Sequence, residues 1–209
     1  MAAKSTKTFS IKEAVSYGWK QATSRLTFFV LLIIIMIAAS ALPGIIGSLL
    51  EDQNAGFLIF IIQLVSWGLQ LLVSLGLIHV ALLVHDRKKA TYKDLFSQTR
   101  LIIPYFLASV IYTLIIIAGF ILLVIPGFVW AIKFRYFSYL MVDKKLGPID
   151  AIKQSGKITK GVKWQLFLFG LVLFGINILG ALVLLVGLLV TIPLSMMAEA
   201  YVYRKLSSK

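Results

Sequence analysis

Long apolar runs constrain this chain more than any other feature of its sequence. A membrane-spanning helix needs about 20 apolar residues, within a range of about 17–25. The sequence contains six apolar segments: Leu26–Leu50, Phe57–Val84, Leu101–Ile125, Phe128–Val142, Trp164–Val186 and Leu188–Tyr203. The fourth and sixth hold only 15 and 16 residues, and the other four are long enough to cross a bilayer. The pattern predicts an all-α, polytopic membrane protein with six transmembrane helices. It leaves open whether the two short segments cross completely.

The composition excludes several other classes of protein. Hydrophobic residues make up 60% of the chain and charged residues 14%, whereas a soluble domain has about 45–50% and about 25%. A soluble enzyme, a disordered chain and a collagen are therefore excluded. The sequence contains no cysteine, which excludes a disulfide scaffold and a thiolate metal site.

The distribution of basic residues predicts how the chain is oriented. Nineteen of the 21 Lys and Arg residues precede the first segment, follow the sixth, or lie between segments two and three or four and five. The opposite side carries only Glu51 and Asp52. Positive residues stay on the cytoplasmic side, so both termini are expected inside a prokaryotic cytoplasmic membrane. The same rule explains the net charge of +13 without a nucleic-acid partner.

Two other arrangements agree with the same charges. Ala39-Ser40-Ala41 follows an apolar run and resembles a signal-peptidase site. Re-entrant hairpins, which enter the membrane and return to the same side, would also leave every basic loop on one face.

The sequence also predicts one membrane domain (1–209) that consists of three similar units, approximately 8–86, 87–143 and 144–206. Each unit has a short amphipathic helix followed by an out-and-back pair of apolar segments. The amphipathic helices of the first and third units share the pattern Glu13-Ala14-Val15 and Asp150-Ala151-Ile152. The returning segments end alike, with Val84-His85-Asp86, Val142-Asp143 and Val202-Tyr203-Arg204. Tight turns are expected at Pro126-Gly127 and at Gly187, where a helix can stop.

The amphipathic helices are expected to lie on the cytoplasmic leaflet. In the third of them, Lys153, Lys157 and Lys160 are spaced i, i+4 and i+7 and form one basic stripe. Basic residues near an anionic leaflet contribute about 1 kcal/mol each. The stripe is consistent with a passive surface anchor and with specific recognition of a lipid or a partner.

Lys133 and Arg135 are unusual because they lie inside the fourth apolar segment. Each such charge costs about 2.5–3.5 kcal/mol at the centre of a membrane. The two residues point about 200° apart on a helix, so one can face lipid while the other faces inward. Three explanations stay open: an ion pair between Arg135 and Glu199 of the sixth segment, contact with an anionic lipid or substrate, or snorkelling to the surface.

The second segment contains the polar residues Gln63, Ser66, Gln70, Ser74 and His79, and Ser66, Gln70 and Ser74 share one stripe because they are four residues apart. Such a stripe can cross-link helices or line a transport pathway. No catalytic residue, cofactor site or metal site is predicted. The two histidines lack partners at metal-ligand spacing, and the sequence has no phosphate-binding glycine loop, nucleophile elbow or HExxH motif.

From about residue 87 onward the chain resembles a known prokaryotic family, the multi-span membrane domain that accompanies some glycerophosphodiester phosphodiesterases, together with its stand-alone six-helix relatives. The resemblance rests on Ile125-Pro126-Gly127, Arg135, Val142-Asp143, Gly147-Pro148-Ile149-Asp150-Ala151, Ser155, Thr159-Lys160-Gly161 and Tyr203-Arg204. It implies a six-helix inner-membrane domain and an association with lipid. It implies no enzyme activity, since no phosphodiesterase domain is recognised in the sequence.

We therefore expect a non-enzymatic integral membrane protein that binds or organises anionic lipid or a membrane partner. The alternative is a small transporter or channel with a polar pathway. The residues expected to contact lipid or ligand are Lys133, Arg135, Lys153, Lys157 and Lys160. A homo-oligomer and a complex with another membrane protein both remain open.

Overall fold

The computed structural model describes residues 8–49, 56–183 and 185–208, and every regular element in these ranges is helical. The expected all-α class is therefore confirmed. The elements are α1 (Ile11–Ser24), α2 (Leu26–Leu49), α3 (Gly56–His85), the 3₁₀ helices η1 (Tyr92–Phe96) and η2 (Thr99–Leu101), α4 (Ile102–Leu122), α5 (Val124–Phe134), α6 (Phe137–Lys144), α7 (Pro148–Ile158), α8 (Lys163–Leu182) and α9 (Leu188–Ser207). The acidic pair Glu51–Asp52 lies outside the described residues.

Among the described residues, four helical segments are long and apolar enough to cross a membrane. They are Leu26–Ile46, Gly56–His85, Tyr92–Leu122 and Lys163–Leu182. These match the four long segments of the sequence. The fourth predicted segment is divided into α5 and α6, which have only 11 and 8 residues. The sixth, α9, is 20 residues long but carries Glu199, Arg204 and Lys205 along its length.

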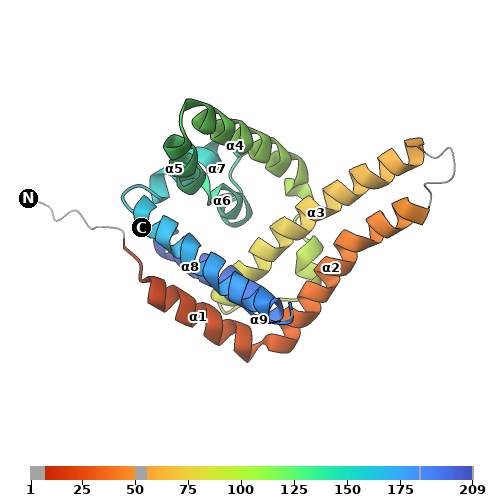
Figure 1. The fold of residues 1–209 in the computed structure, drawn as a ribbon, viewed down its shortest axis with the longest axis horizontal. Coiled ribbons are helices and arrows are strands. Elements are labelled where there is room, and N and C mark those ends of the chain that lie inside the picture. Colours follow the sequence, from red (N-terminus) through yellow and green to blue (C-terminus); the bar gives the residue numbers. More distant parts are fainter. Residues whose placement is uncertain (1–7, 50–55, 184, 209) are drawn as a thin grey trace, which may run out of the picture.

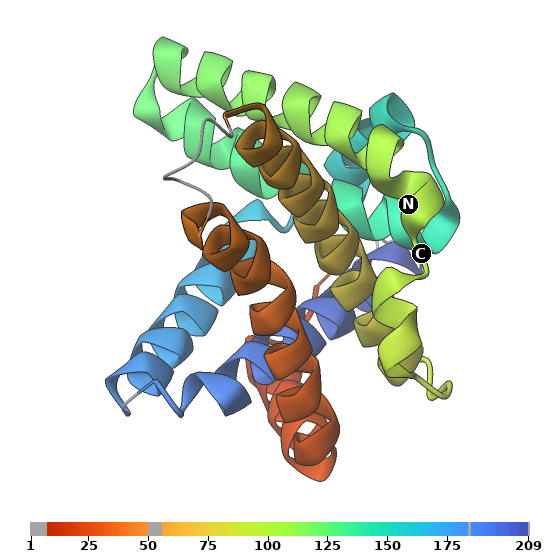
Figure 2. The same cartoon turned by 90° about the vertical axis from the view of Figure 1, so that its right-hand side faces the viewer.

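The helices form hairpins that diverge from a common base. Figure 1 shows the α2–α3 pair projecting to the right of the rest of the chain, and Figure 2 shows α4–α5 and α8–α9 reaching toward separate corners. The far ends of the hairpins are exposed: Phe57 by 80%, Ile121 by 79% and Leu182 by 74%. Apolar side chains so exposed at the tips fit hydrocarbon surroundings rather than water.

The core lies at the base, where the hairpins meet. The largest fully buried side chains include Tyr136, Tyr203, Phe29, Phe169, Leu75, Leu95 and Leu166. They form two clusters: Phe29 and Leu95 belong to one, and the other five belong to the second. The partly buried Tyr139 packs against both clusters. Helix α3 shows the contrast between base and tip: Leu75, Val80 and Val84 near its C-terminal end are buried, whereas Phe57 at its N-terminal end is exposed.

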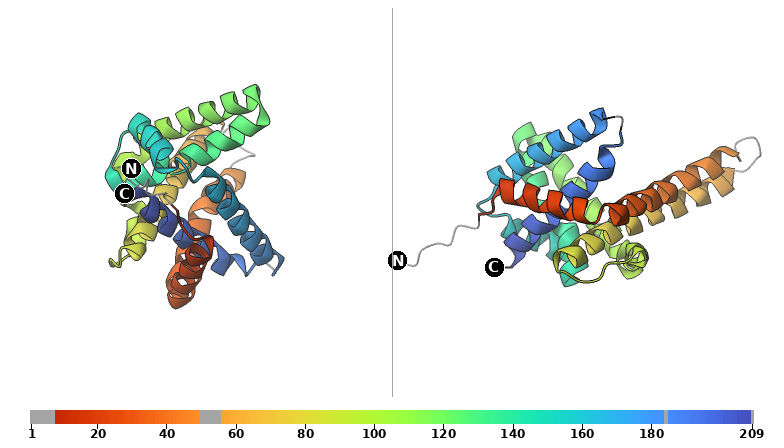
Figure 3. Two further views of the ribbon diagram at one scale, coloured as in Figure 1. Left: turned by 90° about the vertical axis from the view of Figure 1, so that its left-hand side faces the viewer. Right: turned by 90° about the horizontal axis from the view of Figure 1, so that it is seen from below.

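Helix α1 begins at Ser10, whose hydroxyl accepts a hydrogen bond from the Glu13 backbone N–H. The buried residues of α1 are Ala14, Gly18 and Ala22, four apart in sequence. A Cβ atom on Gly18 would lie 2.4 Å from the Leu194 carbonyl oxygen of α9. Helix α1 therefore packs closely against α9 through its small residues. The right panel of Figure 3 shows the course of α1. The Trp19 side chain is exposed.

The turn between α4 and α5 differs from the expected one. The chain reverses at Leu123, which is extended, and Pro126 and Gly127 lie inside α5. Proline is tolerated there because the N–H groups of a first helical turn have no intrahelical partner. Gly127 allows close approach: a Cβ atom on Gly119 would lie 2.9 Å from the Gly127 Cα. The turn between α8 and α9 uses the same device, since a Cβ on Gly187 would lie 2.4 Å from the Gly180 carbonyl oxygen.

Two glycines of α3 offer a matched test of the packed base. A Cβ atom at Gly76 would lie 2.0 Å from the Leu95 carbonyl oxygen, whereas one at Gly68 would meet nothing within 4 Å. We expect Gly76→Ala to lower the free energy of unfolding by about 1–3 kcal/mol, the usual cost of overpacking. Gly68→Ala should leave it unchanged or raise it by up to about 1 kcal/mol. Thermal unfolding of the two purified variants in detergent measures the difference, and equal stabilities would contradict the described contact between α3 and η1.

Candidate functional site

The helix break between α5 and α6 is the local feature around which the candidate site is built. Arg135 and Tyr136 separate the two helices, so backbone groups at the break lack intrahelical partners. Side chains of α7 supply them. The Tyr136 N–H donates to the Ser155 Oγ (3.1 Å), and the Ser155 and Thr159 hydroxyls donate to the Lys133 carbonyl (3.2 and 2.8 Å). Ser155 and Thr159 are fully buried, so α7 holds the break in place.

Arg135 turns inward at the break and meets Glu199 of α9. Its Nη2 donates to the Glu199 Oε1, its Nη1 donates to the Leu166 carbonyl (3.4 Å), and the Tyr136 hydroxyl donates to the Glu199 Oε2 (3.0 Å). The Arg135 side chain is 24% exposed and the Glu199 side chain is 17% exposed. Of the explanations left open by the sequence, the structure shows the geometry of an ion pair. Tyr136, which completes it, was not singled out in the sequence.

Lys133 turns the other way and joins Lys153 and Lys157 of α7 and the two lysines that follow this helix. A hollow of about 570 Å³ is lined by Lys133, Phe134, Lys153, Gly156, Lys157, Lys160 and Lys163. We call it the lysine hollow. No acidic side chain is among these lining residues. A Cβ atom on Gly156 would lie 3.2 Å from the Lys133 Cε, so the glycine gives the Lys133 side chain room to lie across α7. The structure thus groups four of the five predicted contact residues, and it adds Lys163.

A second, apolar hollow adjoins the first. It has a volume of about 480 Å³ and is lined by Ile125, Phe128, Val129, Ile132, Lys163, Trp164 and Phe167. Lys163 belongs to both hollows. A third hollow of about 380 Å³ shares Phe128, Ile132 and Phe167 with the apolar one and reaches Arg135, Tyr112 and Gly170. The three hollows lie along α5, α7 and α8 and are connected through the lining residues that they share, and we refer to them together as the α5–α8 groove.

The chemistry of the α5–α8 groove suits an amphiphile with a negative head. One end presents several ammonium groups and the remainder presents aromatic and aliphatic side chains. The residues of the groove include no carboxylate and no histidine. Within the described residues, no group of three or more His, Cys, Asp or Glu side chains could hold a metal ion.

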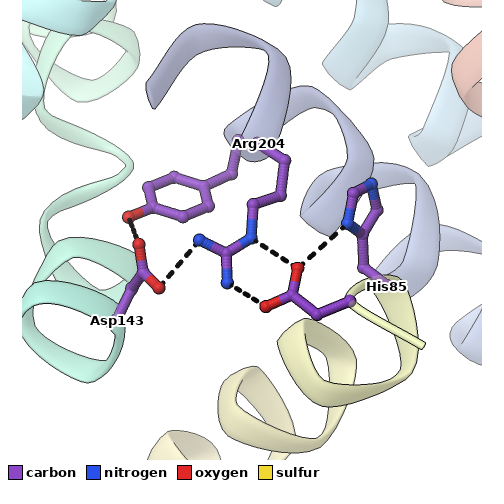
Figure 4. A network of polar contacts seen from close by, with 5 residues as sticks. His85, Asp143 and Arg204 are labelled. Carbon is purple, nitrogen blue, oxygen red and sulfur yellow. Dashed lines mark hydrogen bonds and ion pairs between the residues drawn. The ribbon is translucent and has the colours of Figure 1, made fainter. Parts of the chain in front are cut away.

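A separate ionic network joins the bases of the hairpins (Figure 4). Arg204 of α9 donates from Nε and Nη2 to both Asp86 oxygens (3.0 and 2.6 Å) and from Nη1 to the Asp143 Oδ1 (2.8 Å). The Tyr203 hydroxyl donates to the other Asp143 oxygen (2.7 Å), and His85 Nδ1 lies 3.4 Å from Asp86. We call this the Arg204 junction. Partial burial opposes the charge of Arg204, but the bonds to Asp143 and the charges of both carboxylates raise its pKa.

The polar stripe of α3 lies away from the α5–α8 groove. Ser66 and Ser74 donate to carbonyl groups of their own helix (2.5 and 2.8 Å), and Gln63 and Gln70 are exposed. Asn177 of α8, by contrast, cross-links two helices, because its Nδ2 donates to the Ser195 Oγ of α9 (2.8 Å).

Comparison with known proteins identifies relatives that are uncharacterised. A family described as "Protein of unknown function (DUF975)" matches residues 56–209. An uncharacterised protein of Mycobacterium bovis is 25% identical over 227 aligned residues, which cover 95% of this chain and 69% of that protein. Uncharacterised proteins from two strains of Mycobacterium tuberculosis match with the same identity and coverage. No solved structure matches the chain.

The Arg135–Glu199 pair can be tested by removing its members singly and together. Loss of one partner from a buried pair leaves the other charge uncompensated and costs about 3–5 kcal/mol, whereas replacing both with apolar residues is often close to neutral. We therefore expect Arg135→Met and Glu199→Met each to lower the thermal stability strongly, and the double variant to recover most of it. Additive losses in the double variant, measured by thermal unfolding in detergent, would show that the two side chains do not compensate each other.

Proposed function

The chain belongs to the family of unknown function that matches residues 56–209, and we propose that it is a non-enzymatic integral membrane protein that binds an anionic lipid in the α5–α8 groove. The observation that carries the proposal is the arrangement of the two adjoining hollows, one lined by five lysines and one lined by apolar side chains, with Lys163 shared. A lipid has the same division between a charged head and an apolar tail.

The lysine hollow would provide the selectivity. An acyl chain that moves from bilayer hydrocarbon into an apolar groove exchanges one apolar environment for another, so this step contributes little. The head group, in contrast, gains the lysines. Each basic residue near an anionic group contributes about 1 kcal/mol. Because no lining residue of the lysine hollow is acidic, an anionic head group meets no competing carboxylate there. The resemblance to the membrane domain of glycerophosphodiester phosphodiesterases implies an association with lipid, but the family that matches the chain is one of unknown function and does not link it to those enzymes.

We also propose the finer topology that the sequence predicts. In this arrangement α5–α6 and α9 are returning spans, the three units are repeats, and both termini are in the cytoplasm of a prokaryotic cell. The lysine hollow then faces the anionic inner leaflet. The element order supports the repeats, since a short helix or 3₁₀ segment precedes each of the helix pairs α2–α3, α4–α5 and α8–α9.

A transporter or channel is the alternative function, and the structure gives it less support. Of the polar side chains of α3 expected to line a pathway, Gln63 and Gln70 are exposed, and Ser66 and Ser74 are bonded to the backbone of their own helix. The α5–α8 groove that reaches Arg135 is lined mostly by apolar side chains.

The lipid proposal is tested by neutralising three of the lysines that line the lysine hollow. We expect Lys153→Gln/Lys157→Gln/Lys160→Gln to weaken the binding of phosphatidylglycerol by about a hundredfold, since three contributions of about 1 kcal/mol are lost. Native mass spectrometry of the purified protein, titrated with phosphatidylglycerol, measures the bound fraction. Phosphatidylcholine with the same acyl chains serves as the neutral-head control.

A matched variant controls for net charge. Lys88→Gln/Lys89→Gln/Lys93→Gln removes the same three charges from exposed positions that do not line the α5–α8 groove and should bind phosphatidylglycerol as the wild type does. Equal weakening in both triple variants, or equal binding of phosphatidylcholine by the wild type, would reject the groove as an anionic-lipid site.

The topology is tested with single cysteines, because the natural chain has none. We expect Gln53→Cys to react with a membrane-impermeant maleimide added to intact spheroplasts, and Ser97→Cys to react only after the membrane is opened. Labelling of Gln53→Cys only after opening would mean that the α2–α3 hairpin does not cross, and the six-span arrangement would be wrong.

A further inference from the structure

One surface of α3 combines polar side chains with a regular spacing. Phe60, Gln63, Trp67, Gln70 and Ser74 follow one another at intervals of three and four residues, and all five are exposed. This is the spacing of the a and d positions of a coiled coil, which lie on one side of a helix and face a partner helix. We call these five residues the α3 seam.

The α3 seam does not fit a surface that faces only lipid. Helix α3 is 30 residues long and apolar enough to cross a membrane. Ser74 satisfies its hydroxyl on the Gln70 carbonyl (2.8 Å), but the amide groups of Gln63 and Gln70 extend from an exposed face. Hydrocarbon offers such amides no hydrogen bonds, so polar residues in a spanning helix usually bond to another helix.

We propose that the α3 seam is the interface of a parallel homodimer. A glutamine amide both donates and accepts hydrogen bonds, so the same residue on a second copy is a complete partner for it. All copies insert into the membrane in one orientation, and a twofold axis along the membrane normal brings residues of the same number to the same depth. Gln63 then meets the Gln63 of the second copy, and Gln70 meets the second Gln70.

The surroundings of the α3 seam allow such a pair to form. The α2–α3 hairpin projects away from the other hairpins (Figure 1), so a second chain can approach this part of α3. The Trp67 ring packs edge-on against Phe106 of α4 (centroids 4.7 Å apart) and still leaves 44% of its surface exposed. A second copy is favoured over a different protein because the pattern is complementary to itself, as a twofold interface requires.

Single cysteines in the cysteine-free chain test the dimer in native membranes. Gln63→Cys and Gln70→Cys should each give a disulfide-linked dimer on mild oxidation, because facing positions in a parallel pair bring the two Cα atoms within bonding range. Val65→Cys is the matched control: Val65 is 64% exposed at nearly the same depth as Gln63 but points about 200° away from it. It should remain monomeric.

Each outcome decides the proposal. Cross-linking at both seam positions and not at Val65→Cys supports it. Cross-linking at neither seam position, at only one of them, or equally at Val65→Cys overturns the parallel register. As a second measurement, Gln63→Leu/Gln70→Leu should raise the apparent dissociation constant of the dimer in detergent about five- to tenfold, and an unchanged constant would contradict the role of the amides. Neither experiment alters the lysine hollow, so failure here leaves the lipid proposal standing.

Discussion

The Arg204 junction is the interaction on which the arrangement of the helices depends. Asp86 follows α3, Asp143 lies in the last turn of α6, and Arg204 lies near the end of α9, so one guanidinium holds the ends of three returning helices together. Its contact with Asp86 is bidentate, which fixes direction as well as distance. Held at this point, the hairpins are free to diverge toward their exposed tips, and the α5–α8 groove is the space that this divergence leaves.

The sequence allowed the helical class, the four long segments and the main chemistry of the groove to be predicted, because these depend on local composition. A run of apolar residues specifies a helix of that length wherever it packs, and Lys153 and Lys157, four residues apart, lie on one face of α7. Lys160, which was expected on the same helix, lies beyond its last residue, Ile158. For Arg135, an inward-facing charge in hydrocarbon has few carboxylates within reach, and the structure does place Glu199 beside it. In both cases only a few arrangements of the side chains are physically possible, so the sequence alone limits them strongly.

The features that the sequence did not reveal depend on contacts between distant segments. Nothing in Phe128–Val142 indicates that the helix stops at Arg135, because the break is stable only when Ser155 and Thr159 bond to its free backbone groups. Likewise, Lys163 enters the site only because α8 begins beside α5. The closing patterns of the three units were visible in the sequence, yet the junction of Asp86, Asp143 and Arg204 requires the three chain ends to be brought together first.

The break between α5 and α6 explains why Arg135 and Lys133, two residues apart, have different surroundings. Arg135 is turned toward α9, where Glu199 and Tyr136 balance its charge, so it is already satisfied within the protein. Lys133 is turned toward α7, where the other side chains lining the hollow add only positive charge. An anion from outside the chain would balance this charge, because the residues that line the hollow include no acidic side chain. The segment that supports the break through Ser155 and Thr159 therefore also carries Lys153, Lys157 and Lys160 of the lysine hollow.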